Sequence, residues 1–289
     1  VGIDSETVYT CYAVKRHKLL GVVTAKDLLT HGRAEPIAPL ILSDYISVKT
    51  TDDREYAANL FRRYGLIAIP VVDTEGCIVG IVTFDDAIGV LTEETTEDMQ
   101  KMAAMEANTE PYLKTSVWKH ARHRIVWLLV LMLSASITGA IISKYEAAFA
   151  AVPLLVSFIP MLMDTGGNCG SQSSTLIIRG LAVDELHFAD AAKVIWKELR
   201  VALLVGLGLG IVNAGSIMLR YNDPRLAVVV SLSLLCTVMC AKVTGGLLPI
   251  AAKRLGLDPA LMAAPLITTV VDTVSMLIYF TVATMLFGM

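Results

Sequence analysis

Hydrophobic and polar positions divide the chain into two regions. Up to about residue 124, short apolar runs alternate with polar residues, as in a water-soluble domain. Beyond that point long apolar runs dominate, and five of them are long enough to cross the roughly 30 Å of a bilayer's hydrocarbon. We therefore predict an α+β soluble region followed by an all-α membrane domain, whose five helices cover 125–143, 147–178, 199–219, 226–251 and 260–288.

The second apolar run is too long for a simple span, because its residues would reach about 48 Å as one helix. Pro160 and three glycines, including Gly167 and Gly170, lie within it. Proline removes a helix donor and glycine weakens a helix, so this pattern predicts a break that frees backbone carbonyls. Irregular backbone at membrane depth is tolerated where it lines a wet cavity. The segment is therefore a candidate wall of an ion path.

Basic residues gather in the connections on one side of the predicted helices. Positively charged loops stay in the cytoplasm, so we predict a cytoplasmic N-terminal region and a C-terminus outside. The residues that carry this prediction are Lys114, Lys119, Arg122, Arg124, Arg179, Lys193, Lys197, Arg200, Lys253 and Arg254.

Asp272 lies near the middle of the last apolar run. A charge in lipid costs several kcal/mol, so the presence of this carboxylate within a membrane helix requires an explanation. We favour a cation ligand facing an aqueous path, with Thr268 and Thr269 adding oxygens nearby. The alternative is a structural carboxylate bonded to a neighbouring helix, and Lys242 is the candidate basic partner within the membrane.

Three polar residues of the second run, Asp164, Asn168 and Gln172, offer further oxygens. Asp164 is a candidate ligand or a helix cap, and the two amides are candidate ligands or packing contacts between helices. One carboxylate per chain cannot complete an octahedral site, but two copies around a twofold axis can, with water in the remaining positions. Mg²⁺ suits such a site because it keeps several waters. We therefore predict a symmetric dimer that carries Mg²⁺.

An internal repeat organises the soluble region. Residues 20–29 align with 79–88, and each copy is a short strand followed by Thr, two residues and Asp. This resembles a pair of cystathionine-β-synthase (CBS) domains of β-α-β type, a partial one at 1–42 and a second at 43–91. The resemblance implies that an adenine nucleotide, ATP as a modulator, meets Thr24, Asp27, Thr83 and Asp86. The alternative is that each Thr-x-x-Asp merely caps a helix.

An acidic segment, 92–113, connects the two regions and has the spacing of a polar helix. Carboxylates near a helix N-terminus are stabilised by the helix dipole, which is one explanation. The other is that they hold a regulatory Mg²⁺ whose binding bridges charges that otherwise repel. The candidate ligands are Asp85, Asp86, Glu94, Glu97, Asp98 and Asp258, the last in a cytoplasmic loop of the membrane domain, 114–289.

The acidic linker, the run from Pro160 to Gln172 and the run from Pro265 to Asp272 together resemble the MgtE family of Mg²⁺ channels and transporters. The resemblance implies a homodimer in the bacterial inner membrane, with a pore on the dimer axis for passive Mg²⁺ influx. Asp272 then matches the pore carboxylate and the linker matches a plug helix. The family's ligands for regulatory Mg²⁺, whose binding closes the pore, then correspond to Asp86, Glu94, Glu97, Asp98 and Asp258.

Two features depart from that family. Its typical members carry an acidic helical domain before the CBS pair, whereas the given residues begin within the first CBS domain. Tyr64 is followed here by Gly65 and Leu66 where members often have Asp-Phe. The second departure implies that one regulatory ligand and one adenine-stacking contact of the family differ here.

Other function classes receive less support. A net charge of −3 gives no case for nucleic-acid binding, while 55% hydrophobic residues and a mean hydropathy of +0.62 point to lipid as the partner. The five cysteines lack zinc spacing. Without a nucleophile beside a base, or a Walker-type loop, we predict no enzyme. The remaining alternatives are a transporter of Co²⁺ or Mn²⁺ and a membrane-anchored CBS sensor without transport.

Overall fold

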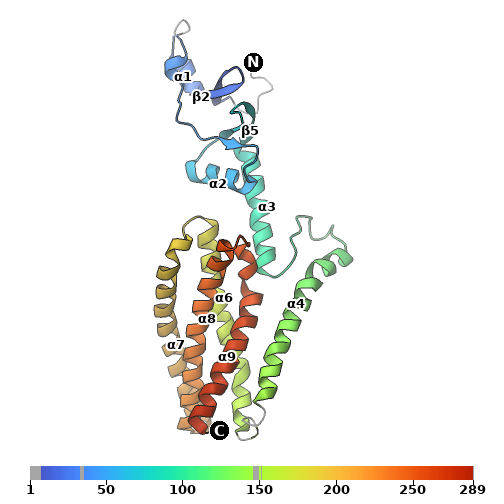
Figure 1. Cartoon of the computed structure of the whole chain (residues 1–289), viewed down its shortest axis with the longest axis vertical. Helices are drawn as coiled ribbons and strands as arrows, with labels where there is room; N and C mark the ends of the chain where they lie inside the picture. The colour runs from blue at the N-terminus through green and yellow to red at the C-terminus, as the bar shows by residue number, and fades with distance from the viewer. Residues whose placement is uncertain (1–7, 33–35, 146–149, 151, 289) are drawn as a thin grey trace. The chain divides into compact units, whose positions relative to one another are not determined.

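The computed structural model describes residues 8–32, 36–145, 150 and 152–288. The chain forms two compact units, 1–96 and 97–289, which are considered separately below. Figure 1 shows the first as a small mixture of strands and helices and the second as a set of long helices. The predicted fold class, an α+β soluble module followed by a helical membrane domain, is confirmed.

The first repeat forms a hairpin and a short helix. Strands β1 (Thr10–Lys15) and β2 (Lys18–Thr24) pair antiparallel, and α1 (Ala25–Thr30) follows. Arg16 and His17 make the turn with φ values of 51° and 67°. Two consecutive positive φ values are characteristic of the tight turns that match strand twist.

The second repeat adds a parallel strand and a helix to the same pattern. β3 (Val48–Lys49) lies parallel to β4 (Ala68–Val72), which pairs antiparallel with β5 (Ile78–Thr83). Between β3 and β4, α2 (Arg54–Tyr64) begins at the cap Asp53 and ends at Gly65, whose φ of 62° suits glycine. The core of this repeat consists of Val48, Ala58, Phe61, Ile69 and Ala87.

The helix that follows β5 differs from the expected connecting helix. α3 (Phe84–Met102) runs without interruption through the predicted boundary at 91/92 and ends well before 113. In its last turn the Gln100 side-chain amide donates to the Asn108 carbonyl at 2.9 Å and accepts from the Asn108 N–H at 2.5 Å. These bonds hold the non-helical segment that follows Met102 against the end of the helix.

The second unit contains five helices of 24 residues or more in its described part. They are α4 (Val117–Lys144), α6 (Ile159–Ala182), α7 (Ala191–Tyr221), α8 (Pro224–Arg254) and α9 (Ala264–Phe287). Short 3-10 helices precede α6, α7 and α9 at Pro153–Phe158, Phe188–Asp190 and Pro259–Met262. In Figure 1, α4 lies at one edge of the bundle, and its Thr138 hydroxyl hydrogen-bonds Thr273 of α9 at 3.0 Å.

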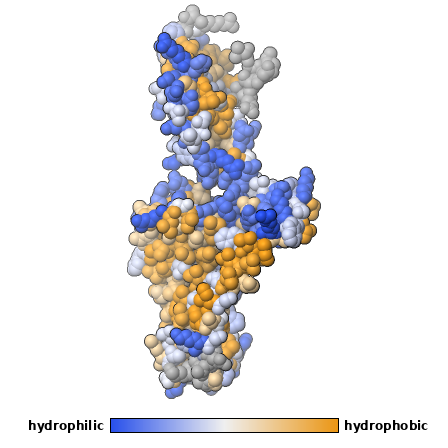
Figure 2. All heavy atoms as spheres, turned by 45° about the vertical axis from the view of Figure 1, so that its right-hand side comes forward, coloured by the Kyte–Doolittle hydropathy of each residue, from blue (hydrophilic) through white to orange (hydrophobic). Residues whose placement is uncertain are grey.

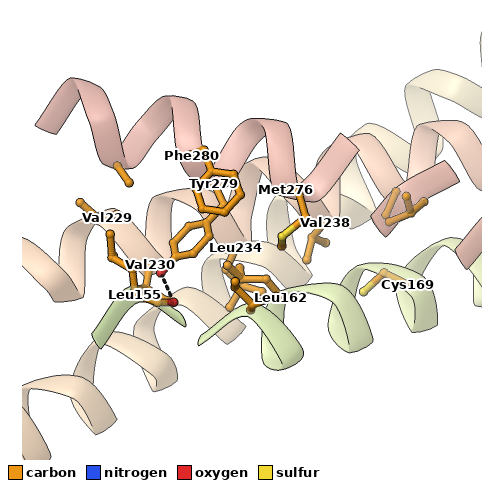
Figure 3. Close-up of a cluster of buried hydrophobic side chains, with 14 of the residues drawn as sticks. Leu155, Leu162, Cys169, Val229, Val230, Leu234, Val238, Met276, Tyr279 and Phe280 are labelled. Atoms are coloured by element: carbon orange, nitrogen blue, oxygen red, sulfur yellow. Dashed lines mark hydrogen bonds between the residues drawn. The ribbon is translucent and has the colours of Figure 1, made fainter. Parts of the chain in front are cut away.

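The centre of this bundle is an apolar core shared by α6, α8 and α9. Figure 3 shows Leu162 and Cys169 of α6 facing Val230, Leu234 and Val238 of α8 and Met276 of α9. Within it the buried Tyr279 hydroxyl donates to the Leu155 carbonyl at 2.9 Å. That bond satisfies both polar groups, as burial requires, and ties α9 to the turn before α6.

The predicted break at the glycines is wrong. α6 continues as a helix from Ile159 to Ala182, and Pro160 lies in its first turn, where proline is tolerated. The irregular backbone instead precedes Pro160, in the 3-10 helix Pro153–Phe158. Positions 147–149 and 151, where the predicted span begins, lie outside the described residues.

The glycines permit close helix contact instead. A Cβ on Gly167 would lie 2.8 Å from Cγ2 of Thr268, and one on Gly245 of α8 would collide with the carbonyl of Gly170. Small residues at such crossings let two membrane helices approach closely. The glycine-rich segment therefore fixes how α6 packs and does not free its backbone.

Four helices of the described chain are long and apolar enough to cross a membrane: α4, the segment Phe188–Tyr221 that contains α7, α8 and α9. The described part of the second predicted span, α6, falls below this criterion, and its glycines, serines and amides lower its hydropathy. Figure 2 shows hydrophobic side chains covering much of the visible face of the helical unit.

Replacing Gly245 with alanine tests the close crossing. Overpacking there is expected to lower the free energy of unfolding by about 1–3 kcal/mol. The higher helix propensity of alanine offsets up to about 1 kcal/mol of this loss. Thermal unfolding of the detergent-solubilised protein measures it. Gly208→Ala on α7, where a Cβ meets open space, is the matched control and should be neutral or stabilising. Equal stability of the two variants would contradict the close crossing.

Candidate functional site

A polar stripe follows one side of α6. Asp164, Asn168 and Gln172 are spaced four residues apart and are all exposed, whereas Cys169 and Gly170 between them are buried. Residues four apart lie on the same helix face. Polar side chains on the surface of a membrane helix are costly against lipid. This surface, the α6 stripe, therefore requires a polar environment.

The first half of α9, which includes Thr268 and Asp272, lies beside this stripe. Thr268 packs against Gly167, and the Asp272 carboxylate is near enough to that of Asp164 for the two charges to interact. The Thr268 and Thr269 hydroxyls both donate to the Pro265 carbonyl, at 2.9 and 3.0 Å. Because a hydroxyl keeps acceptor capacity when it donates, both oxygens remain able to face a cation.

The proposed basic partner of Asp272 is engaged elsewhere. The Lys242 ammonium donates to Ser173 Oγ at 3.3 Å on the buried side of α6. Within the described part of the chain, Asp272 forms no ion pair with a basic side chain. The charge that acts on the Asp272 carboxylate is that of another carboxylate, Asp164. Two like charges at membrane depth suit a cation-binding surface better than a structural salt bridge.

The backbone oxygens proposed for this path are less available than the side chains. The Gly167 carbonyl accepts from the Ser171 hydroxyl at 2.8 Å, and Gly170 is in backbone contact with Gly245. Both lie inside the continuous helix α6. The prediction that these carbonyls are free of helix hydrogen bonds is therefore wrong. The side chains of the α6 stripe and of α9 remain the candidate oxygen ligands.

Two of the acidic residues assigned to regulation converge on one cation. The Lys101 ammonium lies 2.6 Å from a carboxylate oxygen of Glu97 and 2.6 Å from one of Asp258. Partial burial lowers the pKa of Lys101, but the hydrogen bonds and charges of Asp258 and Glu97 prevail and raise it above its usual value. The ion pairs connect the last turns of α3 to the loop before α9.

The other assigned carboxylates belong to different local arrangements. In the first unit, Glu94 pairs with Arg54 at 2.9 Å, as does Glu93 at 3.0 Å. Asp98 follows Glu97 on α3 within the second unit. Among the described residues, no group of three or more His, Cys, Asp or Glu side chains gathers as a metal site.

The two Thr-x-x-Asp motifs form the same local structure. The Thr24 and Thr83 hydroxyls donate to the carboxylates of Asp27 and Asp86, at 2.5 and 2.6 Å. Thr24 caps α1 by accepting from the Asp27 N–H. The side-chain hydrogen bond from Thr83 lowers the pKa of Asp86, helped by a bond from the Thr83 N–H. The capping interpretation is thus realised for Thr24, and in each motif one carboxylate oxygen accepts the threonine hydroxyl at a helix start.

Sequence reasoning missed Lys101 and a buried polar group formed by Ser173, Glu198 and Lys242. The signal for the latter was present, since Glu198 immediately precedes an apolar run and Lys242 interrupts another. Only the packing of three helices shows that the two charges meet at one serine.

Residues 159–282 match the family model of MgtE, a divalent cation transporter, and 37–93 match that of the CBS domain. The magnesium transporter MgtE of Thermus thermophilus is 38% identical over 286 residues, which are 98% of this chain and 63% of that protein. The protein of the same name from Bacillus subtilis is 34% identical over 281 residues, 97% of this chain and 62% of its own length. The chain thus spans somewhat under two thirds of these relatives.

A solved structure of the soluble part of a magnesium transporter shares 37% identity. It covers 32% of this chain and 36% of its own, with a TM-score of 0.31. The cytosolic domain of the Mg²⁺ channel MgtE in complex with ATP shares 38% identity and covers 30% and 36%, with a TM-score of 0.29.

These relatives are named as transporters and not as enzymes, which agrees with the prediction that the chain is not an enzyme. The predicted resemblance is likewise confirmed by the two family matches. Residues 159–282 thus resemble the divalent cation transporter domain of MgtE, and residues 37–93 before them resemble a CBS domain.

Proposed function

We propose that the protein is a homodimeric channel or transporter that admits Mg²⁺ down its electrochemical gradient. The observation that carries this proposal is the α6 stripe beside Asp272, an array of exposed oxygen donors on a membrane helix bundle. Relatives that span longer chains are named magnesium transporters. That name supports Mg²⁺ as the transported ion.

A second copy of the chain provides the polar environment that the stripe needs. Around a twofold axis, the stripe and Asp272 of one subunit would face the same residues of the other. The pair would offer carboxylate, hydroxyl and amide oxygens only, which suit hard cations. A partly hydrated Mg²⁺ fits because it exchanges few of its waters for protein ligands.

Basic residues at two helix ends support a cytoplasmic side for the loops that follow α6 and α8. Lys253, near the end of α8, donates to the Leu181 carbonyl near the end of α6 at 3.0 Å. Arg179 and Arg254 lie in the last turns of the same two helices. Clustered positive charge belongs in the cytoplasm, so we place the soluble module there and the C-terminus outside, in the bacterial inner membrane.

Regulation by cytoplasmic Mg²⁺ would act on the carboxylates at the end of α3. Glu97 and Asp258 already converge on a cation, the Lys101 ammonium, with 2.6 Å contacts. The ammonium occupies the position between the two carboxylates in which we propose that Mg²⁺ binds. Asp98, Glu94, Asp85 and Asp86 complete the proposed acidic set along α3.

Modulation by an adenine nucleotide would use the two helix starts of the CBS module. Asp27 and Asp86 are held by their threonines with one carboxylate oxygen each still available. Ribose hydroxyls can donate to such oxygens, so ATP would bind as a modulator and not as the energy source.

Replacing Asp272 with alanine tests the ion path. The variant is expected to lose nearly all Mg²⁺ uptake into liposomes, measured with an entrapped Mg²⁺ indicator, while its thermal unfolding stays near wild type. Glu185→Ala, which removes an exposed loop carboxylate, is the control and should keep full uptake. Uptake by the Asp272 variant at the wild-type rate would show that the ion path does not depend on this carboxylate. Competition by Co²⁺ and Mn²⁺ for uptake in the same assay tests the selectivity of the path. If the wild-type protein shows no Mg²⁺ flux, the alternative of a membrane-anchored sensor is favoured.

Replacing Lys101 with methionine tests the regulatory site. Without the ammonium, Glu97 and Asp258 repel each other, and a divalent cation should bridge them more readily. We expect Mg²⁺ to inhibit flux at a several-fold lower concentration, measured by titrating Mg²⁺ on the side of the soluble module. Lys119→Met, which breaks the 2.8 Å pair with Glu110, is the matched control. Unchanged inhibition in Lys101→Met would exclude this pair of carboxylates from regulation.

Replacing Asp86 with asparagine tests nucleotide binding. The loss of a charged acceptor should weaken ATP binding about tenfold, the effect of about 1.4 kcal/mol, in calorimetry on the full chain. Asp73→Asn serves as control, because Asp73 only accepts backbone bonds within a turn. If both variants bind ATP like the wild type, the motif is a cap alone.

A further inference from the structure

A buried polar group links three membrane helices on the side of α6 that faces away from the stripe. The Lys242 ammonium of α8 donates to Ser173 Oγ at 3.3 Å, and Ser173 Oγ donates to a Glu198 carboxylate oxygen of α7 at 2.6 Å. Lys242 is 5% exposed, Glu198 9% and Ser173 1%. Buried charges are rare unless they are paired and hydrogen-bonded. Here a single serine hydroxyl connects the two opposite charges.

The direction of these bonds follows from the chemistry of the three groups. An ammonium can only donate and an ionised carboxylate can only accept, whereas a hydroxyl does both. The Ser173 hydroxyl thus accepts a hydrogen bond from Lys242 and donates one to Glu198. Each bond polarises the next, which strengthens such a chain in a low-dielectric interior.

The surrounding backbone makes room for this arrangement. Gly246 of α8, one turn after Lys242, lies beside the Glu198 side chain, whose Cγ would be 3.3 Å from a Cβ at that position. The neighbouring Ser174 donates to the Met262 carbonyl, before α9, at 2.7 Å. Two consecutive serines of α6 therefore bond to α7, α8 and the segment that leads into α9.

We propose that Ser173, Lys242 and Glu198 form a charge clamp that fixes the rotation of α6 about its axis. Ser173 directly follows Gln172, the last residue of the α6 stripe, and successive helix residues point about 100° apart. Holding Ser173 inward between two charges thereby holds Gln172, Asn168 and Asp164 outward. The three are positioning residues. Their consequence for conduction rests on the proposed function, but the rotation itself does not.

Thiol labelling of Gln172→Cys measures that rotation directly. The chain, with its five native cysteines replaced by alanine, is reconstituted in liposomes and treated with a membrane-impermeant methanethiosulfonate. Ser173→Ala should reduce the labelling rate at position 172 at least about tenfold, the size expected when hydrogen bonds to charged groups are lost. Ser233→Ala is the matched control, because the buried Ser233 hydroxyl has no hydrogen-bond partner in the described structure. It should leave the rate unchanged.

Charge variants separate positioning from general loss of structure. Lys242→Arg keeps a charged hydrogen-bond donor and should retain the labelling rate at position 172. Lys242→Met leaves the Glu198 charge without its partner and should reduce that rate. The double variant Lys242→Met with Glu198→Gln leaves no unpaired charge, so it should fold like the wild type. Its labelling rate at position 172 should nevertheless stay below that of the protein with the clamp intact. Wild-type labelling in this double variant, or in Ser173→Ala, would overturn the clamp. Labelling as expected in a protein that passes no Mg²⁺ would instead refute the proposed function and leave the clamp standing.

Discussion

The close approach of α6 to α8 and α9 is the contact on which the rest of the membrane unit depends. At Gly167 and Gly170 the helix has no side chain to hold its neighbours away, so Thr268 and Gly245 lie directly against it. A helix buried so closely on one side must present its other side outward. On α6 the outward side is polar, with Asp164, Asn168 and Gln172. The small residues thus create the site by deciding which residues are left out of the core.

Charges within the membrane unit fall into two kinds that call for different explanations. Lys242 and Glu198 are buried and joined through Ser173, so neither leaves an unsatisfied charge. Such pairs add little net stability but can specify one arrangement over others. The carboxylate of Asp272, by contrast, lies near enough to that of Asp164 for their charges to interact. Because repulsion between them is relieved by a cation, the second kind points to transport and the first to architecture.

The sequence was sufficient for the elements but not for their contacts. Long apolar runs placed α4, α7, α8 and α9, and the repeated strand-Thr-x-x-Asp pattern placed β2, β5 and the helices after them. The glycines of α6 were misread because a glycine that breaks a helix and one that admits a neighbouring helix look the same in one chain. The role of Lys242 depended on which helix faces it. Sequence spacing along α8 alone carries no information on that.

The same reasoning explains why Lys101 matters at the end of α3. Glu97 and Asp258 carry two negative charges, which one ammonium neutralises only by half. Together with the ammonium, the two carboxylates keep a net charge of −1, whereas a divalent ion in place of the ammonium would neutralise them fully. A monovalent side chain thus holds the last turn of α3 against the loop before α9 without satisfying it completely. Under the proposed regulation, a divalent cation would replace this ammonium between the two carboxylates.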